Sequence, residues 1–248
     1  MEKCNSVNDD VVETNHHAVI VAHGWPSNPA RLEADLAWLG RQVEGNLVNW
    51  RVRTATLAAP FALQQVLARS DSQMPLHIYP FFMSDGWFVS SFLRRRVGEI
   101  RSDNLIWHQP FGMCPALTAL CESLLLEHVG NEGFNASTLI AVAHGSPDNP
   151  RPAKVARDLT QKLVEKFNFK ASRNGFVDEA PFIDEVLKID GPAVCLPLFA
   201  SLAGHVREDL ATGLDKTGFE GTVLPVIGTH RDVPRLIANE LAGKIGQT

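Results

Sequence analysis

Two histidines and an acidic pair in the second half of this 248-residue chain are residue types suited to metal handling or proton transfer. His144 and His205 each follow an apolar run, and Asp178 and Glu179 lie between them in FVDEAPF. Imidazoles and carboxylates bind divalent transition metals, and imidazole also exchanges protons near pH 7. If these side chains meet, they can hold a metal ion with open positions; otherwise they are unrelated polar loop residues.

The elements that would bring these residues together alternate between apolar strands and amphipathic helices. In the first half we expect strands at residues 18–24, 52–58, 76–82 and 105–111, and helices at residues 28–44, 60–68, 87–97 and 115–129. Such alternation predicts parallel sheets covered by helices on both faces. Ligands bind beyond the carboxyl ends of such strands, so His23, His144 and His205 should face one crevice.

The second half of the chain repeats the first. AVIVAHGWPSNP, which contains His23, returns as IAVAHGSPDNP, which contains His144, and an equal interval separates Pro60 from Pro181. Landmarks that recur in the same order indicate a duplicated structural unit.

The repeat predicts the domain organisation. We expect an α/β fold of two flavodoxin-like lobes, residues 16–130 and 138–248, each with a parallel sheet of about four strands flanked by helices. Residues 1–15 are expected to form a disordered segment, and GNEGFNAS is expected to link the lobes.

The two copies differ at the candidate chemical positions. Trp87 stands where the second half has His205, and Leu57 and Ala58 stand where it has the acidic pair. Only His23 is retained in the first half. The joint loss of these groups favours a single site, located in the second half.

Composition and missing motifs exclude several classes of function. A net charge of -5 and a pI near 6.0 argue against nucleic-acid binding, which needs a basic face. Residues 1–15 lack the apolar core of a signal peptide and no later run is long enough for a membrane helix, so we expect a cytoplasmic protein with no membrane partner. The four cysteines lack metal-site spacing. There is no G-x-x-x-x-G-K-[ST] nucleotide loop, so no nucleotide cofactor is expected. There is also no G-x-S-x-G motif, which excludes an α/β-hydrolase with a serine nucleophile.

Four motifs together resemble a known family. VAHGS, FVDEAP, LPLFASLAGHVREDL and PVIGTHRDVPRL are similar to elements of the class II tetrapyrrole chelatases, especially the CbiX-type sirohydrochlorin cobaltochelatases and ferrochelatases. The resemblance extends from Ala18 to the end of the chain. It implies a lyase that inserts Co²⁺, Fe²⁺ or Ni²⁺ into a tetrapyrrole such as sirohydrochlorin without ATP, in cobalamin or siroheme biosynthesis. The metal ion is then a substrate, bound in the cleft between two lobes.

The resemblance also implies roles for individual residues. His144 and His205 would bind the incoming metal or take the pyrrole protons. The family's glutamate falls at Asp178 if its distance to Pro181 is kept, or at Glu179 if its identity is kept, and both assignments stay open.

A flat, carboxylate-rich macrocycle needs an apolar cleft with a cationic rim. The candidate cleft residues are His23, Trp25, Trp87, Arg151 and Arg207. Trp25 replaces a serine expected after the first His-Gly, and the histidine missing at Trp87 implies that the amino-terminal site of some relatives is not intact here. That difference motivates one alternative function, a carrier that binds a tetrapyrrole or metal without catalysis. No oligomeric state is predicted.

Overall fold

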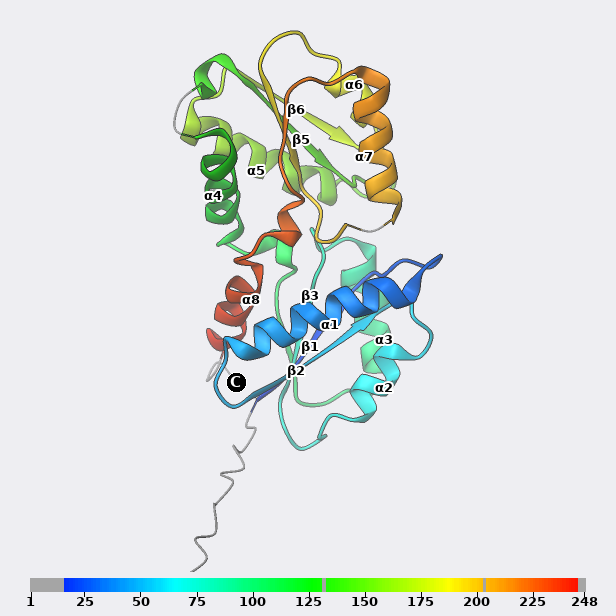
Figure 1. Ribbon diagram of the computed structural model, residues 1–248. Helices are drawn as coiled ribbons and strands as arrows, with labels where there is room; N and C mark the ends of the chain where they lie inside the picture. The colour runs from blue at the N-terminus through cyan, green and yellow to red at the C-terminus, as the bar shows by residue number, and fades with distance from the viewer. Residues whose placement is uncertain (1–15, 131–132, 203, 245–248) are drawn as a thin grey trace, which may run out of the picture.

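The computed structural model describes residues 16–130, 133–202 and 204–244, and the side chains of residues 204–206 are outside the described part. The expected disordered segment, residues 1–15, also lies outside it. The described chain forms two α/β lobes, one above the other in Figure 1. Among the described helices, none is both long enough and apolar enough to cross a membrane.

Each lobe contains one sheet of four parallel strands, as the alternating pattern predicts. The first sheet has the order β2-β1-β3-β4 and the second the order β6-β5-β7-β8. The strands are β1 (His16–Ala22), β2 (Trp50–Thr56), β3 (Leu76–Pro80), β4 (Leu105–Trp107), β5 (Thr138–Ala143), β6 (Ala171–Phe176), β7 (Ala193–Pro197) and β8 (Thr222–Val223).

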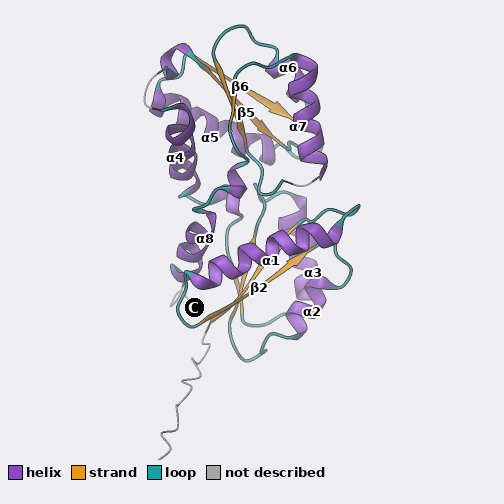
Figure 2. Ribbon diagram, in the orientation of Figure 1, coloured by secondary structure: helices purple, strands orange, loops and turns teal. Residues whose placement is uncertain are grey.

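Helices cover both faces of each sheet (Figure 2). The α-helices are α1 (Pro29–Gly45), α2 (Ala62–Ala68), α3 (Arg94–Gly98), α4 (Leu117–Val129), α5 (Arg151–Phe167), α6 (Ile183–Leu187), α7 (Gly204–Thr217) and α8 (Val233–Ala242). A π-helix, η1 (Phe88–Leu93), precedes α3, and single 3₁₀ turns are η2 (Phe111–Met113), η3 (Phe134–Ala136) and η4 (Ile227–Thr229).

Burial on both faces explains why the strands read as continuous apolar runs. In β1, Ala18 and Ile20 face the cluster that includes α1 and α8, whereas Val19 and Val21 face the cluster that includes α2 and α3. Successive side chains of a strand point to opposite faces, so a strand covered on both sides, such as β1, is mostly apolar at every position.

The last helix of each half packs on the other lobe. Helix α4 lies against α5, and α8 lies against α1, as Figure 1 shows. One buried cluster accordingly runs through both lobes and joins α1 and α8 with α4 and α5. This exchange ties the two lobes into one body around the cleft between them.

The helix expected at residues 87–97 differs from the prediction because it begins as a π-helix. Within this segment Val89 and Leu93 are buried, while Trp87 and Phe88 are exposed. The linker also differs, since Phe134 within it is buried among Phe167 and other aromatic side chains.

Candidate active site

The two His-Gly turns occupy equivalent edges of the two sheets. His23 directly follows β1 and His144 directly follows β5. The next residues, Gly24 and Gly145, have φ angles of 88° and 72°, which disfavour any residue with a side chain. A Cβ at Gly145 would lie 2.8 Å from that of Phe176, so glycine lets the turn fold tightly and turn its histidine outward.

His144 and Asp178 form a hydrogen-bonded pair at this edge. The backbone N–H of Asp178 donates to the carbonyl of His144 at 2.9 Å, which holds the loop after β6 beside the turn after β5. The side chains also meet, with Nδ1 of His144 2.9 Å from Oδ2 of Asp178. Both are nearly half exposed, at 45% and 46%, so the pair orients the imidazole more than it stabilises the fold.

The neighbouring acid, Glu179, points to a different partner. Its Oε1 accepts a hydrogen bond of 2.9 Å from the backbone N–H of Ser146. The same oxygen lies 2.9 Å from the position that a Cβ of Gly145 would occupy. Glu179 therefore braces the His-Gly turn from the side, while Asp178 faces the imidazole.

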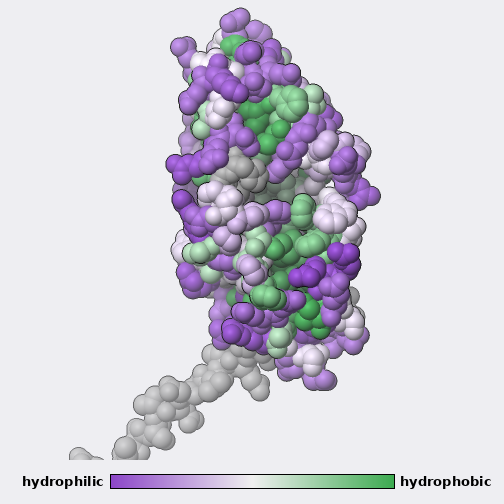
Figure 3. Space-filling view, turned by 90° about the vertical axis from the view of Figure 1, so that its right-hand side faces the viewer, coloured by the Kyte–Doolittle hydropathy of each residue, from purple (hydrophilic) through white to green (hydrophobic). Residues whose placement is uncertain are grey.

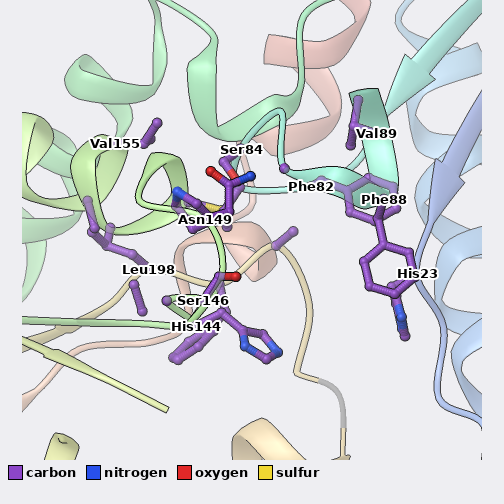
Figure 4. A pocket seen from close by; sticks show the side chains of 18 of the residues that line it. His23, Phe82, Ser84, Phe88, Val89, His144, Ser146, Asn149, Val155 and Leu198 are labelled. Carbon is purple, nitrogen blue, oxygen red and sulfur yellow. The ribbon is translucent and has the colours of Figure 1, made fainter. Parts of the chain in front are cut away.

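A cavity of about 790 Å³ lies between the lobes and contains this edge. Figure 4 shows His23 and Phe88 on one side, and His144 and Ser146 on the other. Apolar side chains form much of its wall, and Figure 3 shows hydrophobic side chains around a hollow on this side of the molecule. The wall includes Phe81, Phe82, Val89, Val155, Leu198 and Phe199. Its volume and character suit a mostly apolar ligand of moderate size.

Two of the predicted cleft residues of the first lobe line this cavity. The ring of the half-buried His23 packs T-shaped against Phe88, with centroids 4.5 Å apart, and its Nδ1 lies 3.1 Å from the carbonyl of Gly24. Trp87 is 56% exposed and also lines the cavity.

The other predicted cleft residues have different surroundings. Trp25 is half-buried, and neither it nor Arg151 and Arg207 is among the described residues that line the cavity. Arg151 begins α5, and its Nη1 lies 2.8 Å from Oδ2 of Asp85 in the opposite lobe. Arg207 is exposed on α7. Arg151 thus forms an ion pair across the two lobes.

The second predicted histidine, His205, belongs to the first turn of α7, but its side chain lies outside the described part of the structure. Within the described residues, no three His, Cys, Asp or Glu side chains are grouped closely enough to hold a metal ion.

Several polar cavity residues were not singled out from the sequence. Ser146, Asp148 and Asn149 line the cavity between β5 and α5, and Ser84 lines it from the first lobe. The signal for the first three was their place in SPDNP, since residues between a strand end and the next helix face the ligand edge.

Comparison with known proteins places the chain in a family. A family model described as CbiX matches residues 138–243. The solved structure titled "The structure of CbiX, the terminal Enzyme for Biosynthesis of Siroheme in Denitrifying Bacteria" is 36% identical with a TM-score of 0.82, over 93% of this chain and all of that one. The chain belongs to the CbiX family. The resemblance inferred from the four motifs is therefore confirmed.

More distant structures share the fold of this CbiX family member. SirB from Bacillus subtilis with Fe³⁺ is 12% identical with a TM-score of 0.76, over 94% of this chain and 96% of that one. The multi-domain DR2241 from Deinococcus radiodurans is 17% identical with a TM-score of 0.70, over 94% of this chain and 56% of that one. Among curated proteins, the sequence comparison finds no match.

Proposed function

We propose that this CbiX family protein inserts a divalent metal ion, Co²⁺, Fe²⁺ or Ni²⁺, into a tetrapyrrole such as sirohydrochlorin, without ATP, in the cavity between its lobes. The observation that carries the proposal is the pair of His144 and Asp178 at the cavity wall, 2.9 Å apart. Family membership supports the reaction class, since the related CbiX is described as the terminal enzyme of siroheme biosynthesis. Siroheme is an iron tetrapyrrole, so a terminal step that supplies its iron is a metal insertion.

The proposed chemistry exchanges two pyrrole protons for one metal ion. Asp178 accepts a hydrogen bond from the Nδ1–H of His144, which leaves Nε2 as the basic ring nitrogen for a metal ion or a proton. When the imidazole takes a pyrrole proton, the adjacent carboxylate stabilises the resulting cation. The proton then passes to water at the open side of the pair, and His144 is ready for the second one.

The remaining predicted groups have supporting roles in this proposal. His205 provides a second imidazole for the metal ion, from the start of α7. We assign the working carboxylate to Asp178 rather than Glu179, because Glu179 accepts the N–H of Ser146 instead of facing the histidine. A site with few protein ligands suits a metal that must be released to the macrocycle.

The test follows metal insertion by the change in tetrapyrrole absorbance. Purified protein is mixed anaerobically with sirohydrochlorin and each of the three metal ions, and product is counted per protein molecule. We expect many turnovers for the wild type and a loss of about 100-fold or more for His144→Ala and His205→Ala. His128→Ala is the matched control, because His128 is an exposed histidine on α4 and does not line the cavity. Product limited to one equivalent would contradict catalysis and support the alternative of a carrier.

A further inference from the structure

Trp87 is an exposed aromatic residue that occupies the position of a histidine in the other half of the chain. It precedes η1 in the first lobe, whereas His205 stands at the matching place in the second. Its side chain is 56% exposed although it lines the cavity that contains His144. A large aromatic surface that is exposed to water in a cavity is unfavourable, and a planar apolar ligand that covered it would remove this free-energy cost.

Neighbouring rings hold the indole in a defined orientation. The centroid of Trp87 lies 5.2 Å from that of Phe88 at 75° and 5.4 Å from that of Phe92 at 37°. Phe88 in turn packs perpendicular to the ring of His23. These distances and angles are those of favourable aromatic pairs, so the cluster fixes the indole plane before any ligand arrives.

The backbone before Trp87 also lies close to the second lobe. A Cβ built on Gly86 would lie 3.8 Å from Cγ of Pro152 and 4.0 Å from Nδ2 of Asn149. Both partners belong to the segment that runs from the His144 turn into α5. The aromatic surface and the histidine are therefore parts of one packed cavity rather than of two separately moving lobes.

We infer that Trp87 is the surface on which one face of the tetrapyrrole macrocycle stacks, opposite the edge that carries His144. The inference rests on the proposed function and assigns a different role to each half of the chain. The first half has exchanged metal-binding groups for an aromatic platform that holds the ring, and the second half handles metal and protons. A macrocycle presents an extended π-face, and indole offers the largest aromatic surface among the side chains, so offset stacking is the contact expected between them.

Exposure alone does not identify such a surface, and the chain provides a comparison. Trp38 on α1 is 55% exposed, nearly the same as Trp87, but it does not line the cavity. Single exposed aromatics are ordinary on protein surfaces. Trp38 is therefore a matched control for Trp87, equal in type and exposure and different only in location.

The experiment measures binding of metal-free sirohydrochlorin, with no metal present, by the change in the absorbance of the ring. Trp87→Leu keeps an apolar side chain without the aromatic face and should weaken binding about tenfold. Trp87→Phe keeps a smaller aromatic face and should remain within about threefold of the wild type. Trp38→Leu should bind as the wild type does. With metal added, Trp87→Leu should raise the KM for the tetrapyrrole and retain kcat at saturation.

The results distinguish a failure of the proposed stacking surface from a failure of the proposed reaction. Wild-type affinity in Trp87→Leu, or equal losses in the leucine and phenylalanine variants, overturns the platform while insertion by the wild type stands. Ring binding that depends on Trp87 without metal insertion by the wild type overturns the reaction and keeps the platform. Thermal unfolding of each variant checks its fold, and the surface position of Trp87 makes substitution tolerable.

Discussion

Acid should destabilise this protein through two histidines buried in the first lobe. His77 on β3 and His108 after β4 are 2% and 4% exposed, and Nδ1 of His77 lies 2.8 Å from Nε2 of His108. Burial, with the nearby charges of His16 and Lys244, lowers the pKa of His77 to about 4. Burial, with the neighbouring His77 and Lys244, lowers the pKa of His108 to about 3. Both stay neutral in the folded protein at pH 5.

The sign and size of the effect follow from the unfolded chain, where a histidine has a pKa of about 6.5. The folded values are lower, so the unfolded state binds more protons and the free energy of unfolding falls as the pH drops from about 6.5 towards 4. At pH 5 each histidine accounts for about 2 kcal/mol, because it would gain its proton 1.5 pH units below the unfolded pKa at about 1.36 kcal/mol per unit. The pair should therefore remove about 4 kcal/mol between pH 8 and pH 5.

Urea unfolding at pH 8 and pH 5 measures this loss within each variant. His108→Gln removes one of the two titrating rings, so its loss between the two pH values should be smaller than that of the wild type by about 2 kcal/mol. His128→Gln, on the exposed side of α4, should show the wild-type loss. Carboxylates contribute equally to all three proteins, so their effect cancels in the comparison. An identical loss in His108→Gln and the wild type would refute the reasoning.

Three further predictions concern the turn after β5 and the loop after β6 beside it. Asp178→Asn should slow metal insertion about 10- to 100-fold, because it alters the group that orients His144. Glu179→Gln should keep most of the rate, since its amide oxygen can still accept the N–H of Ser146; a loss as large as that of Asp178→Asn, measured by absorbance, would contradict the assignment of the carboxylate to Asp178. Gly145→Ala should lower the free energy of unfolding by about 1 to 3 kcal/mol, because a Cβ is strained at a φ of 72° and meets the β6 side. Urea titration checks it, and wild-type stability would contradict the strain.

The sheets could be predicted because strand burial leaves a direct pattern in the sequence. Each strand of AVIVAHG type is covered on both faces, so its apolar run is uninterrupted, and the glycine after each histidine marks the strand end. The repeat then placed His23 and His144 at matching edges. These inferences need only local sequence, since a strand and its following turn are contiguous in the chain.

The sequence could not show which of the two adjacent carboxylates, Asp178 or Glu179, contacts His144. Asp178 and Glu179 share a loop, and only the path of the backbone past His144 decides which carboxylate faces the imidazole. The ion-pair partner of Arg151 likewise could not be predicted from the sequence, because Asp85 belongs to the opposite lobe. Contacts between distant segments depend on how whole lobes dock.

The repeat and the apolar alternation determined the class of fold, the number of sheets and the edge at which chemistry could occur, because these depend on burial patterns within each half. The tertiary structure decided that α4 lies on the second lobe and α8 on the first. An amphipathic helix records that one face must be buried, but not which of two similar sheets buries it. The packing of the two lobes also forms the cavity, which is lined by both Trp87 and His144 although they are far apart in the chain.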